Sequence, residues 1–189
     1  MNKRNIVVGL GKLIRSMLLA WLSMFVFAAF STAEPAPRID GPPTRLLIPT
    51  IELDEPIAPV GIRLFEIDGQ QYGIWNVRDN EVGWHNLSAN LGQLGNTVLS
   101  GHSDVKARVF QNLWQIEVGD EIVAFSGDQP RHYVVIEKLL VQEKGVSLET
   151  RIKNAQLIAP TDDERLTLVT CAKPGATHRL IVIAQPKDG

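Results

Sequence analysis

The sequence predicts a mainly β domain, namely a closed or nearly closed eight-stranded β-barrel with one or two short helices. From Arg45 onward, short runs rich in β-branched residues alternate with turn-forming Gly, Pro, Asn and Asp, which is typical of all-β folds. Only two stretches of this region show helical spacing of apolar residues. A barrel is favoured over the alternative, a two-sheet sandwich, because closure leaves no exposed strand edge.

Eight strands are expected after the first forty residues, and turn dipeptides separate several of them. Asp68-Gly69 and Gly127-Asp128 are examples, because glycine accepts positive φ angles and aspartate hydrogen-bonds to its own backbone. In chain order the expected strands are Arg45–Ile48, Ile57–Ile62, Tyr72–Val77, Thr97–Ser100, Glu121–Phe125, Arg131–Val141, Arg165–Thr170 and His178–Ala184.

Two segments have helical spacing instead. The segment Val109–Trp114 places its apolar residues on one face of a helix. The segment Ser147–Ile158 begins with a serine of the kind that caps helices and continues with apolar residues at roughly helical spacing. We therefore expect one short helix before the strand at Glu121 and one before the strand at Arg165.

Residues 1–33 predict an export segment. Lys and Arg come first, an apolar run extends from Met17 to Phe30, and small residues precede Glu34. This order is typical of a signal peptide, and an uncleaved N-terminal membrane anchor is the alternative. The 14 residues of this run would span about 21 Å as a helix, less than a roughly 30 Å hydrocarbon core unless the helix extends further. Both interpretations place the rest of the chain at the extracytoplasmic face of the membrane, anchored or secreted.

The remainder of the chain divides into a linker and a folded domain. Residues 34–44 contain four prolines and predict a semi-rigid linker, and residues 45–189 form the domain. The formal net charge is −2, but residues 1–33 hold four of the 19 basic residues and none of the 21 acidic ones. The remaining 15 basic and 21 acidic residues give −6, which argues against nucleic acid as a partner.

The chain has one cysteine, Cys171. This excludes an internal disulfide and any metal site built from several thiolates. Cys171 ends an apolar strand just before Pro174-Gly175, where a side chain can reach a cleft. A lone thiol in an exported protein is either a reactive nucleophile or a small buried hydrophobe, and its position alone leaves both open.

A reactive thiolate needs a base or a cation nearby. Among the four histidines, His102 is the best candidate because it ends an apolar strand and is followed by Ser103 and Asp104, which could orient its ring. The other three have ordinary explanations: His85 in an expected loop, His132 in a long strand and His178 at the start of the last strand.

Arg179 is the third candidate. It shares a strand face with Ile181 and Ile183, and a short connection would bring it to the same sheet edge as Cys171. A guanidinium beside a nucleophile can hold a developing oxyanion. An ordinary surface salt bridge is the alternative.

Together these segments resemble the sortases. Gly95–His102 is similar to the strand of that family that ends in Gly-His, and Thr167–Cys171 (TLVTC) matches its TLxTC motif in full. Arg179 stands where the family has an arginine on the last strand. The resemblance extends from about Arg45 to Ala184 and is greatest for small members, of the class D, E or F kind. It implies a sortase-like barrel as the catalytic domain, residues 45–189.

The resemblance also implies a mechanism. Cys171 would attack a peptide carbonyl in a C-terminal LPxTG-like sorting motif and form a thioacyl intermediate. Arg179, helped by the Thr170 hydroxyl, would hold the oxyanion, and His102 would protonate the leaving amine. An amine of a cell-wall precursor, or of another protein such as a pilin, would then accept the acyl group. No cofactor and no metal are required, and the sequence contains no carboxylate cluster typical of a calcium site.

Two other functions remain open at the level of the sequence. A secreted cysteine peptidase would use the same thiol and imidazole but transfer the acyl group to water. A non-catalytic β-barrel binding module would leave Cys171 unreactive.

Overall fold

The computed structural model describes residues 40–172 and 176–187, which belong to one compact unit of residues 36–189. The predicted export segment, residues 1–33, and most of the predicted linker, residues 34–44, lie outside the described residues. Within the described part of the chain, no helix is both long and apolar enough to cross a membrane.

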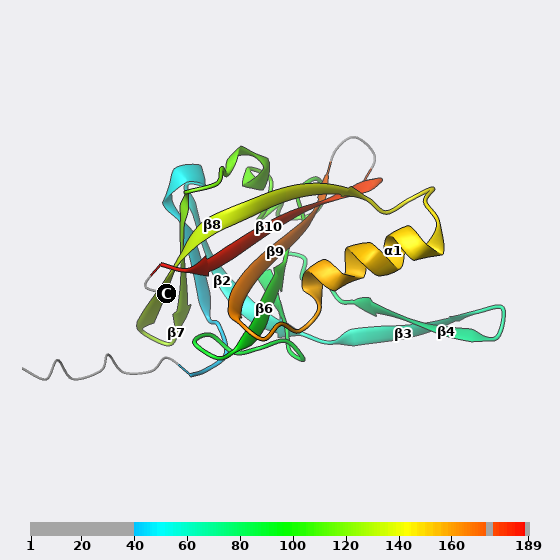
Figure 1. Ribbon diagram of the computed structural model, residues 1–189, viewed down its shortest axis with the longest axis horizontal. Helices are drawn as coiled ribbons and strands as arrows, with labels where there is room; N and C mark the ends of the chain where they lie inside the picture. The colour runs from blue at the N-terminus through cyan, green and yellow to red at the C-terminus, as the bar shows by residue number, and fades with distance from the viewer. Residues whose placement is uncertain (1–39, 173–175, 188–189) are drawn as a thin grey trace, which may run out of the picture. The chain divides into compact units, whose positions relative to one another are not determined.

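A closed barrel of eight strands forms the body of the unit, as the sequence predicts (Figure 1). A two-sheet sandwich is therefore excluded. Around the barrel the strands are β1 (Arg45–Ile48), β2 (Leu53–Val60), β5 (Val82–His85), β6 (Gly95–Ser100), β9 (Glu164–Ala172), β10 (His178–Pro186), β8 (Gln129–Gln142) and β7 (Glu121–Ser126).

Strand direction brings three chain segments to one end of the barrel. Strands β6 and β9 are parallel, so both end there, and β10 pairs antiparallel with β9, so it begins there. The inward residues of these strands, among them Leu99, Leu168 and Val182, are buried in the common core. The outward residues at the same strand ends are therefore the ones available for chemistry.

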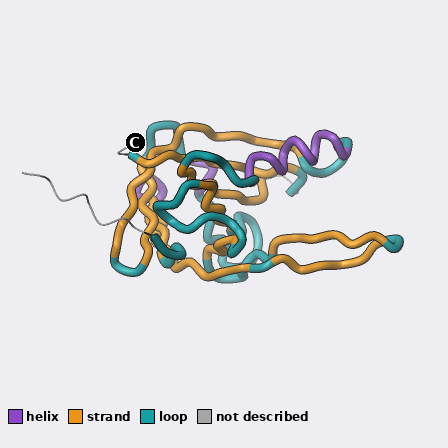
Figure 2. Tube along the Cα trace, turned by 60° about the horizontal axis from the view of Figure 1, so that its bottom comes forward, coloured by secondary structure: helices purple, strands orange, loops and turns teal. Residues whose placement is uncertain are grey.

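Two strands form a separate hairpin, and this corrects the predicted strand list. Strands β3 (Ile62–Ile67) and β4 (Gln70–Trp75) pair only with each other, so the expected strand Tyr72–Val77 does not belong to the barrel. Asp68 and Gly69 have positive φ angles of 50° and 75°, which is the geometry of a tight hairpin turn. The hairpin extends away from the barrel (Figure 2).

The eighth barrel strand is β5, where the sequence predicts a loop around His85. The alternation of side chains that predicts a strand is not recognisable in this segment, because Gly83 has no side chain. A Cβ at Gly83 would lie 2.9 Å from Cγ1 of Val60, so the neighbouring strand can approach only a glycine here. Contact between strands, rather than local pattern, determines β5.

One predicted helix is confirmed and the other is not. Helix α1 (Leu148–Ala155) is capped by Ser147, whose side chain accepts a hydrogen bond from the Thr150 amide at 3.2 Å. It continues into the 3₁₀ turn η3 (Gln156–Ile158).

The stretch Val109–Trp114, the other predicted helix, is a turn followed by the 3₁₀ turn η2 (Leu113–Gln115). Its apolar residues have another role than forming a helix face: Phe110 and Leu113 are buried in the core and hold the loop against the barrel. A third 3₁₀ turn, η1 (Pro49–Ile51), connects β1 to β2.

Candidate active site

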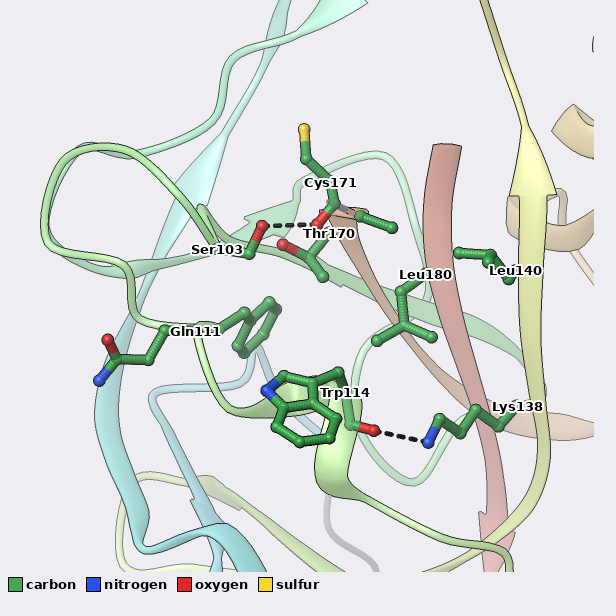
Figure 3. A pocket seen from close by; sticks show the side chains of 10 residues that line it. Ser103, Gln111, Trp114, Lys138, Leu140, Thr170, Cys171 and Leu180 are labelled. Carbon is green, nitrogen blue, oxygen red and sulfur yellow. Dashed lines mark hydrogen bonds between the residues drawn. The ribbon is translucent and has the colours of Figure 1, made fainter. Parts of the chain in front are cut away.

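Cys171 lies near the end of β9 as a partly exposed free thiol. Alternation along the strand turns Leu168 and Thr170 toward the barrel interior, where both are buried, and turns Val169 and Cys171 outward. Figure 3 shows the sulfur of Cys171 pointing away from the side chains that fill the barrel mouth. The thiol is therefore presented to the outside of the barrel, as a nucleophile requires.

Arg179 is the direct cross-strand neighbour of Cys171, as the predicted short connection requires. The antiparallel register of β9 and β10 pairs Cys171 with Arg179 and Ala172 with His178. Residues paired in this way have their side chains on the same face of the sheet. Arg179 donates a hydrogen bond to the carbonyl of His178 at 3.3 Å, and no carboxylate among the described residues forms an ion pair with it. The salt-bridge alternative therefore has no partner within residues 40–172 and 176–187.

His102 follows the end of β6, the parallel neighbour of β9. The register pairs Ser100 with Val169, and the amide of Gly101 donates to the carbonyl of Val169 at 3.2 Å. Thr170 Oγ1 donates to the carbonyl of Gly101 at 2.7 Å and Ser103 Oγ donates to the carbonyl of Cys171, so the residues on both sides of His102 lie beside the end of β9. The structure thus brings His102, Cys171 and Arg179 to adjacent positions at one end of the barrel.

The loop after His102 is held by its own contacts. The carbonyl of His102 accepts a hydrogen bond from the Phe110 amide at 2.9 Å, and Ser103 Oγ donates to the carbonyl of Cys171. A Cβ at Gly101 would lie 2.8 Å from the Phe110 ring, so only glycine fits before His102. The sequence predicts that Ser103 orients the His102 ring; its hydroxyl instead connects the loop to Cys171.

Thr170 does not have the geometry expected of an oxyanion donor. Its side chain is 3% exposed and points to the opposite face of β9 from Cys171. The hydroxyl donates its one hydrogen to the carbonyl of Gly101 at 2.7 Å. The expected oxyanion role is therefore replaced by a structural one, since this bond fixes the end of β6 to the end of β9.

A pocket of about 370 Å³, the outer pocket, lies on the outer face of β6. Its floor contains His85 of β5 and Val98 of β6, and the remaining lining comes from the start of β6, the β5–β6 connection, the β8–β9 connection and the hairpin. These lining residues are Trp75, Leu87, Ser88, Ala89, Leu94, Gly95, Asn96, Ile158, Pro160 and Thr161. Asn96 and Val98 line the pocket and Ser100 follows them on the same face of β6, so the pocket lies along β6 before the segment that carries His102.

Asn96 holds one wall of the outer pocket in place. Its amide nitrogen donates to the carbonyls of Leu157 and Ala159 at 3.3 and 3.2 Å, and its oxygen accepts from Thr167 at 2.7 Å. These bonds connect the segment after α1 to both β6 and β9. No local pattern in the sequence indicates a role for Asn96, because its partners are about sixty or more residues away in the chain.

His85 is a buried, neutral part of the pocket floor. It is 3% exposed, and burial lowers its pKa from 6.5 to about 4, because the charged form loses its hydration. Its Nε2 is 3.1 Å from Ser100 Oγ, and its ring stacks on Trp75 at a centroid distance of 4.0 Å and an interplanar angle of 16°. The sequence predicts a loop at His85, and no local signal connects this residue with the pocket.

A second cavity of about 460 Å³, the mouth cavity, lies on the inner side of β9 (Figure 3). Phe110, Leu180 and the exposed residues Trp114 and Leu140 give it an apolar lining, and Lys138 Nζ donates to the Trp114 carbonyl at 2.6 Å. Cys171 contributes to its rim, but the sulfur points away from it. Among the described residues, no group of three or more His, Cys, Asp or Glu side chains is arranged to hold a metal ion.

Comparison with known proteins decides the family. The sortase domain family matches residues 46–187, which is most of the chain and the whole barrel. The chain belongs to the sortase family. Membership indicates a cysteine transpeptidase, and sortases act on proteins that carry a sorting signal.

Solved sortase structures have the same fold. A sortase D transpeptidase from Clostridium perfringens is 22% identical, with 77% of this chain and 78% of that chain covered and a TM-score of 0.57. The lid mutant of sortase A from Corynebacterium diphtheriae is 23% identical, with 80% and 74% covered and a TM-score of 0.57. A sortase E variant from Streptomyces avermitilis is 22% identical, with 79% and 90% covered and a TM-score of 0.55. No curated protein sequence matches this sortase.

Proposed function

We propose that this sortase cleaves a C-terminal LPxTG-like sorting motif through a thioacyl intermediate on Cys171 and transfers the acyl group to an amine. The observation that carries the proposal is the pairing of Cys171 with Arg179 across two strands, with His102 in the segment that follows the neighbouring strand β6. A nucleophile, a cation and a general acid–base are the groups that acyl transfer from a peptide requires.

In the first step the Cys171 thiolate attacks the scissile carbonyl carbon. The carbonyl oxygen becomes an oxyanion on the face of the sheet that Cys171 and Arg179 share, and the Arg179 guanidinium stabilises its charge. Protonated His102 gives its proton to the amide nitrogen as the carbon–nitrogen bond breaks. The amine product leaves, and the acyl group remains as a thioester on Sγ.

In the second step an acceptor amine attacks the thioester carbonyl. Neutral His102 removes a proton from the attacking nitrogen, Arg179 again holds the oxyanion, and the carbon–sulfur bond breaks. The product is a new amide, and Cys171 is regenerated as a thiolate. The two steps consume no oxidant, metal or nucleotide, so no cofactor is required.

The spacing of the outer pocket from the nucleophile fits a short extended motif. Val98, on the pocket floor, precedes His102 by four residues, which span at most about 14 Å. An extended peptide of about four residues covers the same length. His102 must protonate the leaving nitrogen, and it lies at the end of β6 away from the pocket. The acyl half of the motif therefore occupies the outer pocket, and the leaving half extends past His102.

The proposed partners follow from the chemistry. The donor is a protein with a C-terminal sorting signal, and the acceptor is an amine of a peptidoglycan precursor or of a pilin-like protein. The enzyme works at the extracytoplasmic face of the membrane, where residues 1–33 either anchor it or direct its secretion. Nucleic acid is not a partner, since the domain is acidic.

A peptide assay with an added amine tests the proposal. Wild-type protein is incubated with an LPxTG peptide, with and without a short peptide that has a free N-terminal amine, and the products are identified by mass. We expect an amide adduct that depends on the amine and is absent for Cys171→Ala. If the product were only the free acid at every amine concentration, the enzyme would be a cysteine peptidase. If Cys171 formed no thioester with any peptide, the transpeptidase proposal would be overturned.

A further inference from the structure

The β3–β4 hairpin leaves apolar side chains in solvent. It extends from the same side of the barrel as helix α1 (Figures 1 and 2), and Ile62 and Leu64 are 45% and 65% exposed. Single exposed apolar residues are ordinary, but a row of them beside a binding pocket is typical of an interaction surface.

Three apolar side chains form such a row on one face of the hairpin. Ile62 pairs with Trp75 and Leu64 pairs with Gly73, so all four residues share that face. A Cβ at Gly73 would lie 2.8 Å from Cγ2 of Ile62 and 3.6 Å from Cδ2 of Leu64, which shows that both side chains lie across β4. We name Ile62, Leu64 and Trp75 the hairpin row.

The hairpin row continues the outer pocket. Trp75, the last residue of β4, lines that pocket and stacks on His85 of its floor. The base of the hairpin is closed by a bond from the Asn76 amide to the Gly61 carbonyl at 3.0 Å. A peptide that leaves the pocket past Trp75 therefore meets Ile62 and Leu64 next.

Strand β4 also offers backbone groups for pairing. In the described part of the chain it pairs with β3 alone, so its other edge has no strand partner. Two-stranded sheets are marginally stable, and an extended peptide can add a third strand to such an edge. Backbone hydrogen bonds would supply affinity, and alternate side chains would contact the hairpin row.

We infer that the hairpin binds the extended segment of the donor protein immediately N-terminal to the sorting motif. This inference rests on the proposed function, which places the acyl half of the motif in the outer pocket. The six residues of β4 correspond to about 20 Å of strand, so about six donor residues are bound. Donors with apolar residues at alternate positions in this segment are preferred over donors with a polar segment.

Three peptides test the inference with the full-length protein. One carries the motif alone, the second adds six upstream residues with valine or leucine at alternate positions, and the third adds six serine and glycine residues. For wild type we expect the apolar extension to raise kcat/KM about tenfold through KM, and the polar extension to have little effect. Equal kcat/KM for all three peptides would overturn the inference.

Two variants identify the face that binds. The double variant Ile62→Ser/Leu64→Ser should lose the gain from the apolar extension, while cleavage of the short peptide is unchanged and reports an intact fold. Ile74→Ser is the matched control, because Ile74 is 42% exposed but belongs to the opposite face of the same hairpin, and it should keep the gain. A gain that survives in the double variant, or that is lost equally in the control, would contradict binding at the hairpin row.

Failure of the inference differs from failure of the proposed function. If the inference fails, all three peptides are acylated and cleaved with one kcat/KM. If the proposed function fails, none of them acylates Cys171, and no effect of length can be measured.

Discussion

The two faces of strand β9 differ in what they contact, although their residues alternate along one chain. Thr170 and Leu168 face inward, where Leu168 belongs to the core and Thr170 borders the apolar mouth cavity. Val169 and Cys171 face outward, beside Arg179. A single strand therefore stabilises the barrel with one set of side chains and presents Cys171, the proposed nucleophile, with the other.

The two cavities repeat this difference. Apart from Cys171 at its rim, the mouth cavity is lined by inward strand residues and by the segment that follows His102, and it gathers apolar side chains such as Phe110 and Leu180. The outer pocket contains polar groups that are bound to neighbouring segments: His85 Nε2 lies 3.1 Å from Ser100 Oγ, and Asn96 donates to the segment after α1. The Cys171 sulfur thus points away from the mouth cavity, although Cys171 lies at its rim, because strand alternation turns this side chain outward.

The largest expected effect comes from Cys171→Ala on the outer face. It removes the nucleophile, so acylation and amide formation should fall below detection in the peptide assay. The fold should be almost unchanged, because the thiol is partly exposed and small, and the thermal midpoint measures this. Residual thioester chemistry in the variant would show that the outer face of β9 does not carry the reaction.

The next effect is expected for Arg179→Lys. Lysine keeps the charge but loses the planar pair of donors, so kcat/KM should fall by about two decades, with kcat responsible for most of the loss. Steady-state kinetics with the LPxTG peptide measure it, and Lys138→Arg, on the inner side, is the control with an expected change below about twofold. Wild-type kinetics for Arg179→Lys would mean that the cross-strand neighbour of Cys171 takes no part in catalysis.

His85 tests the outer pocket through stability rather than rate. Its pKa is about 4 in the folded protein and 6.5 in the unfolded chain, so the unfolded state binds the proton more strongly. The contribution of neutral His85 to the free energy of unfolding is therefore complete above pH 6.5 and is lost as the pH falls toward 4. Between pH 7.5 and pH 5 the folded state should lose about 2 kcal/mol through this group.

Denaturant unfolding of wild type and His85→Gln at both pH values measures this contribution. Other acid-sensitive groups remain in both proteins, so the difference between their pH dependences isolates His85. Identical pH dependence would contradict a neutral, buried His85 at the pocket floor.

The smallest effect is expected for Trp114→Ala in the mouth cavity. Trp114 is 65% exposed and lies on the inner side of β9, away from the sulfur. Its loss should change kcat/KM for the LPxTG peptide by less than about twofold. A decrease of a decade or more would mean that the donor uses the mouth cavity, and the distinction between the two faces would fail.

The barrel strands that carry Cys171 and Arg179 were predictable because their signals are local. Thr167–Cys171 and His178–Ala184 have continuous apolar patterns, and a six-residue connection leaves little choice but antiparallel pairing. Ser147 was predictable as a helix cap for the same reason. Strand β5 was not predictable, since it depends on the contact between Gly83 and Val60. The hairpin was not predictable either, since local pattern does not show that its strands pair outside the barrel.

By itself, the sequence determined the chemistry: one thiol at a strand end, a Gly-His strand before it and an arginine after it. Only the tertiary structure decided which face each group occupies, that the Thr170 hydroxyl is bound to Gly101, and that His85 and Trp75 form part of a pocket. The physical reason is that residue types and short-range spacing are properties of the chain, whereas burial and hydrogen-bond partners depend on segments that meet only when the barrel closes.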